Sequence, residues 1–263
     1  MGSHITHRAA VLGSPIEHSK SPVLHNTGYN ALGLDQWEDD RFECTGDMLP
    51  GIVSGADETY RGFSVTMPSK FAALEFADEV TERARAIGSA NTLLRTETGW
   101  RADNTDVDGI RGALGELLGG ASLSGKHPIV IGSAGTARPA IWALIEAGVA
   151  RITVLNRSDR TAELQTLFDE TPTTLAYAPL EHLHIEADVV VSTVPSAAIA
   201  GLEDTLAIAP VLDVIYDPWP TPLVEVTRAK GLKAVGGHVM LAHQSYGQFE
   251  QFTGMDAPRD AMR

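Results

Sequence analysis

The chain has 263 residues, 43% of them hydrophobic and 21% charged, which is the composition of a globular protein of one or two domains. Its formal net charge of −14 argues against a general nucleic-acid or anionic-membrane surface, and its single cysteine, Cys44, excludes a disulfide framework and a multi-cysteine zinc site. With no run of about 18 apolar residues and no signal-peptide core, the sequence predicts a cytoplasmic protein that binds neither membrane nor nucleic acid, and we expect no metal.

The first part of the chain alternates short strands with helices. We predict a strand over 9–12, a helix over 22–32, a buried strand over 62–66, a helix from about Ser69, and a hairpin of 91–95 with 100–102. A helix over 106–118 then leads into the stretch from Gly119 to Gly125, whose small residues are typical of a domain boundary.

Beyond that stretch the pattern becomes a stricter alternation of strand and helix. The expected elements are strands at 128–131, 151–155, 187–191, 211–215 and 234–235, with helices at 137–147, 159–168 and 238–252. The strands are rich in β-branched residues, as expected of parallel strands buried on both faces. The pattern indicates an α/β protein of two domains. Residues 1–104 plus 238–263 would form an α/β substrate domain, and residues 105–237 a Rossmann-type doubly wound nucleotide domain.

Two hydroxyl groups, Ser19 and Ser21, lie between the first strand and the first helix. They belong to the stretch from Gly13 to Asn26, which reads GSPIEHSKSPVLHN. Hydroxyls and free backbone N–H groups at a helix N-terminus suit a carboxylate or another small anion. In the alternative interpretation Ser21 only caps the helix, with Pro22 at the first helical position.

A glycine-containing turn between a strand and a helix indicates a dinucleotide site. It consists of Gly132, Ser133, Ala134, Gly135, Thr136 and Ala137. Glycines at such a turn permit close approach of the backbone to a pyrophosphate, although αβ turns also carry glycine for packing alone. Ala134 stands where the middle glycine is usual, and whether its methyl group weakens cofactor binding is left open by the sequence.

The end of the next strand favours NADP over NAD. NAD sites place Asp or Glu there to accept from the ribose 2′-hydroxyl. This chain has Asn156, Arg157 and Ser158, followed by Arg160. A guanidinium group suits bidentate recognition of a 2′-phosphate. The alternative is that both arginines are simply solvated.

Lys70 and Asp106 are the candidate acid–base pair. Lys70 stands at the start of a predicted helix, where a cation is unfavourable with respect to the helix dipole. A lysine and a carboxylate in one site each favour the charged form of the other. Asn91 and Gln244 add amides that suit a polyhydroxylated ligand. A solvated Lys70 is the alternative, and His238 and His243 are interpreted as ordinary helix or surface histidines.

Seven segments in chain order resemble the shikimate dehydrogenase family. They are the Ser19/Ser21 string, Val65–Lys70, Ala90–Thr92, Asn104–Asp106, Asn156–Ser158, Tyr216–Pro218 and the helix carrying Met240 and Gln244. The resemblance implies two α/β domains and reversible NADPH-dependent reduction of 3-dehydroshikimate to shikimate in chorismate and aromatic amino-acid biosynthesis. Ser64 stands where the family most often has Asn, and Ser69 is a second small departure.

The resemblance also implies a role for each matching residue. Ser19, Ser21 and Thr66 would hold the substrate carboxylate, and Lys70, Asn91, Asp106 and Gln244 the ring hydroxyls, with Lys70 and Asp106 catalytic. Asn156, Arg157 and Ser158 would hold the 2′-phosphate. The cleft for nicotinamide and substrate would be lined by Thr193, Ile215, Tyr216, Gly237 and Met240.

Two other functions stay open at this point. One is an NAD-dependent quinate/shikimate dehydrogenase, which the Asn156-Arg157-Ser158 strand end disfavours. The other is a non-catalytic protein that binds nucleotide or shikimate, which would have no need of a proton-transfer pair. A monomer and a homodimer are both compatible with the sequence.

Overall fold

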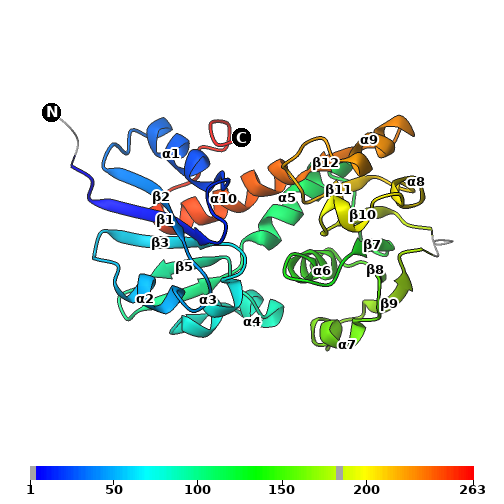
Figure 1. Cartoon of the computed structure of the whole chain (residues 1–263), viewed down its shortest axis with the longest axis horizontal. Helices are drawn as coiled ribbons and strands as arrows, with labels where there is room; N and C mark the ends of the chain where they lie inside the picture. The colour runs from blue at the N-terminus through cyan, green and yellow to red at the C-terminus, as the bar shows by residue number, and fades with distance from the viewer. Residues whose placement is uncertain (1–3, 182–185) are drawn as a thin grey trace. The chain divides into compact units, whose positions relative to one another are not determined.

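The computed structural model describes residues 4–181 and 186–263, which divide into two compact units. Unit 1 comprises Met1–Thr105 and Gln244–Arg263, and unit 2 comprises Asp106–His243. Each unit is built on its own six-stranded sheet with helices packed on it (Figure 1). The predicted α/β class with two domains is confirmed.

The sheet of unit 1 is mixed, with strand order β2-β1-β3-β5-β6-β4. Its strands are β1 (His7–Gly13), β2 (Trp37–Glu43), β3 (Tyr60–Val65), β4 (Glu79–Val80), β5 (Thr92–Arg95) and β6 (Trp100–Asp103). β1 runs parallel to β2 and β3, whereas β5 runs antiparallel to β3 and β6. The hairpin predicted from the sequence is therefore confirmed.

Helices cover both faces of this sheet. They are α1 (Ser21–Ala31), α2 (Leu49–Ser54), α3 (Lys70–Phe76), α4 (Glu82–Ile87) and, from Gln244 onward, α10 (Gly237–Thr253). Alternate residues of β1 point to opposite faces. Ala10 and Leu12 pack in one core cluster with Leu49 of α2 and Ala73 of α3. In a separate contact, α1 and α10 pack together through Tyr29 and Phe249, whose rings lie 5.3 Å apart.

The sheet of unit 2 is parallel throughout, with strand order β12-β11-β10-β7-β8-β9. Its strands are β7 (Pro128–Ile131), β8 (Arg151–Asn156), β9 (Thr174–Pro179), β10 (Val189–Ser192), β11 (Val211–Asp213) and β12 (Ala234–Gly236). Numbered from β7, this is the 3-2-1-4-5-6 order of a doubly wound dinucleotide fold, and the order reverses between β7 and β10.

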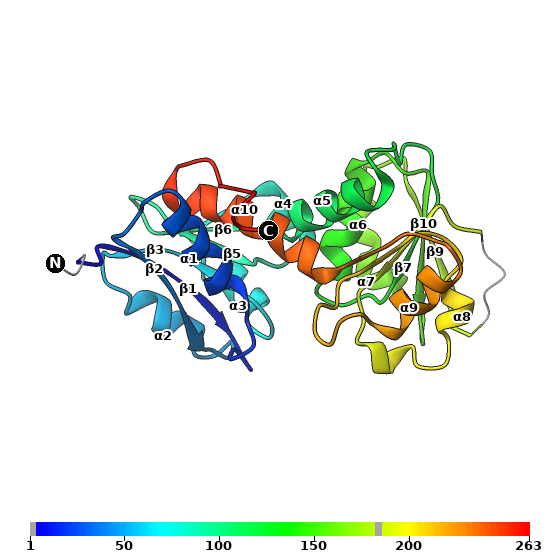
Figure 2. The same ribbon diagram turned by 90° about the horizontal axis from the view of Figure 1, so that it is seen from above.

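The helices of unit 2 lie on both sides of this sheet, with α5 and α6 on one side and α8 and α9 on the other (Figure 2). Their bounds are α5 (Asp106–Leu118), α6 (Ala137–Glu146), α7 (Thr161–Leu164), α8 (Glu203–Leu206) and α9 (Pro222–Ala229), with short 3-10 turns at Gln165–Leu167 and Ser196–Ala198. Ile129, Leu155 and Val211 belong to the core on one face of the sheet.

Some predicted bounds differ from those observed. The helix expected over 159–168 is shorter, consisting of α7 and the 3-10 turn at Gln165–Leu167. The sequence did not predict β2, α2, β4, α4, β9, α8 or α9. β2 was missed because it reads WEDDRFE and lacks apolar alternation, although it pairs with β1 along its full length. No helix in the described residues is long and apolar enough to cross a membrane.

Candidate functional site

In unit 1 the chain leaves β1 and β3 at adjacent points of the same sheet edge. Thr66 N donates to Leu12 O at 2.8 Å, and Ser14 N donates to Met67 O at 3.0 Å. Gly13 makes this close approach possible, because a Cβ there would lie 2.3 Å from Thr66 Cγ2. The structure therefore brings together the two loops that carry the predicted carboxylate ligands.

Ser19 and Ser21 lie on the loop that enters α1. Ser21 is the first residue of the helix and is 5% exposed, while Ser19 is half-buried. Lys20 occupies the N-cap position without a side-chain capping bond, and Ser19 Oγ accepts from Ser21 N at 3.4 Å. The interpretation of Ser21 as an N-cap is therefore wrong, because Ser21 already lies inside the first turn.

Lys70 begins α3 and is half-buried. Its position is fixed through the backbone, since Lys70 O accepts from Ala90 N at 3.0 Å. The preceding residue, Ser69, is fully buried and donates through its hydroxyl to Cys44 O at 2.8 Å. The hydrogen bond from Ser69 thus connects the start of α3 to the residue that follows β2.

Asn91 is buried, and its amide organises the segment that leads to Asp106. Asn91 Oδ1 accepts from Thr105 N and from Thr92 Oγ1, each at 2.8 Å, while Nδ2 donates to Thr105 Oγ1 at 3.0 Å. Asp106 follows directly as the first residue of α5 and is 2% exposed.

Sequence reasoning missed Gln248, which lies one turn beyond the predicted Gln244 on α10. Gln248 is 1% exposed, and its amide nitrogen donates to Asn91 O at 2.9 Å and to Thr92 Oγ1 at 3.0 Å. Its amide oxygen accepts from Ser64 Oγ at 3.1 Å. The signal was the spacing of four residues, which places both glutamines on one helix face. Ser64, one of the departures from the family pattern, thus bonds through its hydroxyl to a residue of its own unit.

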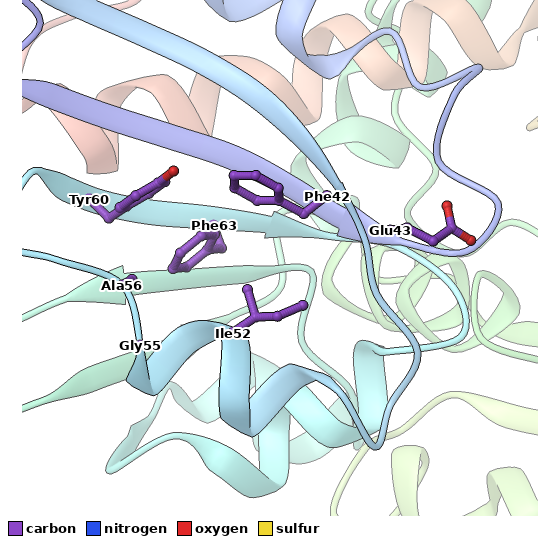
Figure 3. Close-up of a pocket in the computed structure, with 7 residues that line it drawn as sticks. All are labelled: Phe42, Glu43, Ile52, Gly55, Ala56, Tyr60 and Phe63. Atoms are coloured by element: carbon purple, nitrogen blue, oxygen red, sulfur yellow. The ribbon is translucent and has the colours of Figure 1, made fainter.

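A separate pocket of about 290 Å³ opens in unit 1 between β2, β3 and α2. It is lined by Phe42, Glu43, Ile52, Gly55, Ala56, Tyr60 and Phe63, and none of the predicted site residues contributes to it (Figure 3). The predicted substrate residues and this pocket are therefore different features of unit 1.

In unit 2 the glycine-containing turn lies at the reversal point of the strand order. Gly132 has φ +102°, and a Cβ there would lie 2.7 Å from both Thr193 Oγ1 and Val194 Cγ1. Thr193 Oγ1 in turn donates to Ile131 O at 2.7 Å. The turns after β7 and β10 are therefore packed together at the edge where open α/β sheets bind ligands, and glycine is required at position 132.

The rest of the turn, after Gly132, leads into the start of α6. Thr136 is the N-cap residue, and its side chain makes no capping bond. Ala134 is exposed and has no positive φ, so alanine fits the backbone there, and a Cβ at Gly135 would meet nothing within 4 Å. The N–H groups of Ala137 and Arg138 donate to Ala134 O, at 2.9 and 3.4 Å, and Pro139 has no N–H. The glycine-containing turn itself is therefore the part that suits the pyrophosphate of a dinucleotide.

The end of β8 presents the predicted cations. Arg157, Ser158 and Arg160 are all exposed. Among the described residues, Arg157 Nη2 makes only a long 3.4 Å contact with Ala198 O, whereas Arg160 Nη1 lies 2.8 Å from Glu163 Oε1. A further cation that sequence reasoning missed is Arg138 in the first turn of α6, which donates to Glu163 O at 2.8 Å. These groups suit the 2′-phosphate of NADP.

Of the remaining predicted site residues, Ile215 and Tyr216 follow β11, while Gly237 and Met240 lie at the start of α10. Gly237 N donates to Ile215 O at 3.1 Å, and a Cβ on Gly237 would lie 1.9 Å from Val214 O, so only glycine fits. Tyr216 is 36% exposed, and burial followed by the nearby Asp217 charge raises the pKa of its phenol. Met240 is 6% exposed on α10.

The comparisons with known proteins agree on one family. The model for the shikimate dehydrogenase substrate binding domain matches residues 11–93, and that for the shikimate 5′-dehydrogenase C-terminal domain matches residues 237–263. The chain is 31% identical over 271 residues to shikimate dehydrogenase (NADP(+)) of Microcystis aeruginosa, covering 96% of this chain and 93% of the relative. It is also 34% identical to the pentafunctional AROM polypeptide of Saccharomyces cerevisiae, of whose length it spans 17%.

Solved structures give the same result. Shikimate dehydrogenase of Mycobacterium tuberculosis superimposes with a TM-score of 0.91 at 48% identity, covering 97% of each chain. Shikimate 5-dehydrogenase of Thermus thermophilus, solved with NADP(H) and shikimate, gives a TM-score of 0.83 at 33% identity, again covering 97% of each chain. The resemblance drawn from the seven sequence segments is confirmed, and the chain belongs to the shikimate dehydrogenase family.

Proposed function

We propose that this chain catalyses the reversible NADPH-dependent reduction of 3-dehydroshikimate to shikimate. The observation that carries the proposal is the junction of the two segments that follow β1 and β3, which lead to Ser19 and Ser21 and to Thr66 and Lys70. This junction lies within the stretch that matches the substrate binding domain of the family. The Thermus thermophilus relative was solved with NADP(H) and shikimate, which supports the same pair of ligands here.

The substrate residues are assigned by their chemistry. Ser19 and Ser21, with Thr66, would hold the carboxylate through hydroxyl donors. Lys70, Asn91, Asp106 and Gln244 would bind the ring hydroxyls, and Tyr216 would contact the substrate. Asn91 is well suited to a fixed contact, because Thr105 and Thr92 already hold its amide and little rotamer freedom remains to be lost on binding.

The cofactor residues are assigned to unit 2. The turn from Gly132 to Ala137 would bind the pyrophosphate, and Asn156, Arg157, Ser158 and Arg160 the adenosine ribose and its 2′-phosphate. Thr193, Ile215, Gly237 and Met240 would line the nicotinamide. NADPH supplies the hydride when bound.

The chain itself supplies proton handling. Lys70 and Asp106 would give up or accept the proton at the substrate oxygen that becomes the hydroxyl as the carbon is reduced. A positioned acid–base group contributes about 10²–10⁴-fold in rate, which is the size of effect expected from this pair.

The deciding experiment follows NADP reduction at 340 nm with shikimate, and repeats it with NAD and with quinate. Turnover with NADP and shikimate alone is the expected result. Equal turnover with NAD or quinate would favour the NAD-dependent quinate/shikimate dehydrogenase. Binding of shikimate by calorimetry without turnover would favour a non-catalytic binding protein.

The assembly and location of the protein follow from the same proposal. We expect a monomer or a homodimer in the cytoplasm that acts on small molecules and binds no nucleic acid. Sedimentation velocity separates the two assemblies. The activities of the much longer AROM polypeptides are not proposed for this chain beyond the one named above.

A further inference from the structure

We propose that Arg41 and Glu43 are positioning residues that hold the Ser19/Ser21 loop in the conformation that binds the substrate carboxylate. The inference rests on the proposed function, because it assigns a task to that loop. Neither residue lies in the segments that carry the family resemblance, and neither is expected to touch the substrate.

The two residues lie on one face of β2. Asp39, Arg41 and Glu43 are two positions apart, so their side chains point to the same face of the sheet. Phe42, between them, packs against the core cluster on the other face. Figure 3 shows the result: Phe42 lies with Tyr60 and Phe63 at the apolar pocket, whereas the carboxylate of Glu43 is turned away from it.

All three charged residues bond to the segment that runs from β1 into α1. Glu43 accepts from the hydroxyl of Ser14 and from Ile16 N, the latter at 3.2 Å. Arg41 donates to Ser19 O twice, from Nε at 3.1 Å and from Nη2 at 3.0 Å. Asp39 accepts from the ring of His25 at 2.7 Å. The contacts therefore follow an antiparallel order: along β2, Asp39 meets His25, Arg41 meets Ser19, and Glu43 meets Ile16 and Ser14.

The bond from Arg41 fixes the peptide that joins Ser19 to Lys20. A trans peptide is planar, so holding Ser19 O toward β2 turns Lys20 N–H to the opposite side. This peptide lies between the two serines that would hold the carboxylate. Fixing its plane therefore limits the orientations that Ser19 and Ser21 can adopt relative to each other.

The charge of Glu43 makes a direct substrate contact unfavourable, because it would repel a carboxylate ligand. Glu43 instead accepts hydrogen bonds from Ser14 and Ile16 of the loop, which suits a residue that holds the loop in place. A loop that is free to adopt other conformations binds with an apparent affinity reduced by the fraction of the competent one. The pair would thus act on substrate affinity and leave the chemical step and the cofactor unaffected.

The test compares Arg41→Ala, Arg41→Lys, Glu43→Ala and Glu43→Gln with Glu38→Ala. Glu38 lies on the same strand but forms only an exposed 3.6 Å ion pair with Arg8 among the described residues. We expect both alanine variants to raise the KM for shikimate about tenfold, as when the competent loop conformation falls to about a tenth of the population. The kcat, the KM for NADP and the Glu38→Ala variant should stay within about twofold of wild type by the same argument. Glu43→Gln should restore most of the affinity, since an amide oxygen still accepts from Ile16 N, and Arg41→Lys should restore part.

Hydrogen exchange of the unliganded protein gives a second readout that does not depend on turnover. Exchange in residues 14–21 should rise in both alanine variants and not in Glu38→Ala. An unchanged KM for shikimate in both alanine variants, with a wild-type protein that turns shikimate over, would overturn the positioning role and leave the proposed function standing. A wild-type protein that neither binds nor reduces the substrate would overturn both. A fall in kcat, or failure of Glu43→Gln to rescue, would also contradict the assignment.

Discussion

The side-chain amide of Asn156 donates a 2.9 Å hydrogen bond to the hydroxyl of Ser133, which joins the end of β8 to the turn after β7. The oxygen of the same amide accepts from Arg157 N, also at 2.9 Å. One side chain therefore sets the relative position of the pyrophosphate turn and the cation that follows β8. This pre-organisation matters because the two parts would bind different phosphates of one cofactor.

Arg157→Ala should raise the KM for NADP by one to two orders of magnitude. A charge-assisted hydrogen bond to a phosphate contributes about 1.5–3 kcal/mol, and the guanidinium of Arg157 makes only one long contact within the described part of the chain. Initial-rate kinetics with NADP and NAD measure the effect. Arg151→Ala is the matched control, since Arg151 is exposed at the opposite end of β8. A variant that loses equal affinity for NADP and NAD would contradict a role at the 2′-phosphate.

Ala134→Gly tests the unusual residue of the turn. Ala134 is exposed and lies where a glycine normally allows close backbone approach to the pyrophosphate. We expect a fall of a few-fold in the KM for NADP, together with a loss of about 0.5–1 kcal/mol in the free energy of unfolding from the greater backbone entropy of glycine. Kinetics and urea unfolding give both numbers. A KM that stays the same would show that the methyl group does not obstruct the cofactor.

Lys70→Ala should lower kcat by about 10²–10⁴-fold while the KM for NADP is preserved. A folding defect is not expected to mimic this result, because Lys70 is held through its backbone oxygen, which the substitution keeps. Steady-state kinetics with both substrates varied separates the two constants. Lys233→Ala, at an exposed lysine of unit 2, serves as the control. A large loss of NADP affinity with kcat intact would refute the placement of Lys70 in the substrate site.

Five of the six strands of unit 2 could be predicted from the sequence because they are short apolar runs, whereas β9 and the helices α8 and α9 were missed. In unit 1, β2 was missed because it carries charges on both faces and so lacks the apolar alternation of a half-buried strand. Asp39, Arg41 and Glu43, which helped to hide the strand, are also the residues that bond to the segment from β1 into α1. The glycine-containing turn and Arg157 could be predicted because each directly follows a strand that is recognisable in the sequence. Gln248 was missed although it lies four residues after Gln244, because the partners that show its contacts, Asn91 and Thr92, are 157 and 156 positions away in the chain.

The buried carboxylate of Asp103 links the stability of unit 1 to pH. Arg83 bonds to both of its oxygens, and Thr81 and Gln251 donate as well. Burial alone would raise the pKa of Asp103, but the hydrogen bonds and charge of Arg83 outweigh it and hold the pKa at about 2. An unfolded aspartate titrates near pH 3.9. The stabilisation is therefore fully present above that value and is lost as the pH falls through about 2.

Arg83→Ala should lower the free energy of unfolding by about 2–3 kcal/mol at pH 7, because a buried carboxylate loses its charged partner. It should also raise the pKa of Asp103, so the difference from wild type should shrink as the pH falls from 5 toward 2 and the carboxylate becomes protonated in both proteins. Urea unfolding at several pH values measures the trend. Arg111→Ala removes exposed ion pairs to Asp108 and Glu146 and should cost at most about 1 kcal/mol. A difference between Arg83→Ala and wild type that stays constant over this pH range would mean that Arg83 stabilises unit 1 by packing and not through the charge of Asp103.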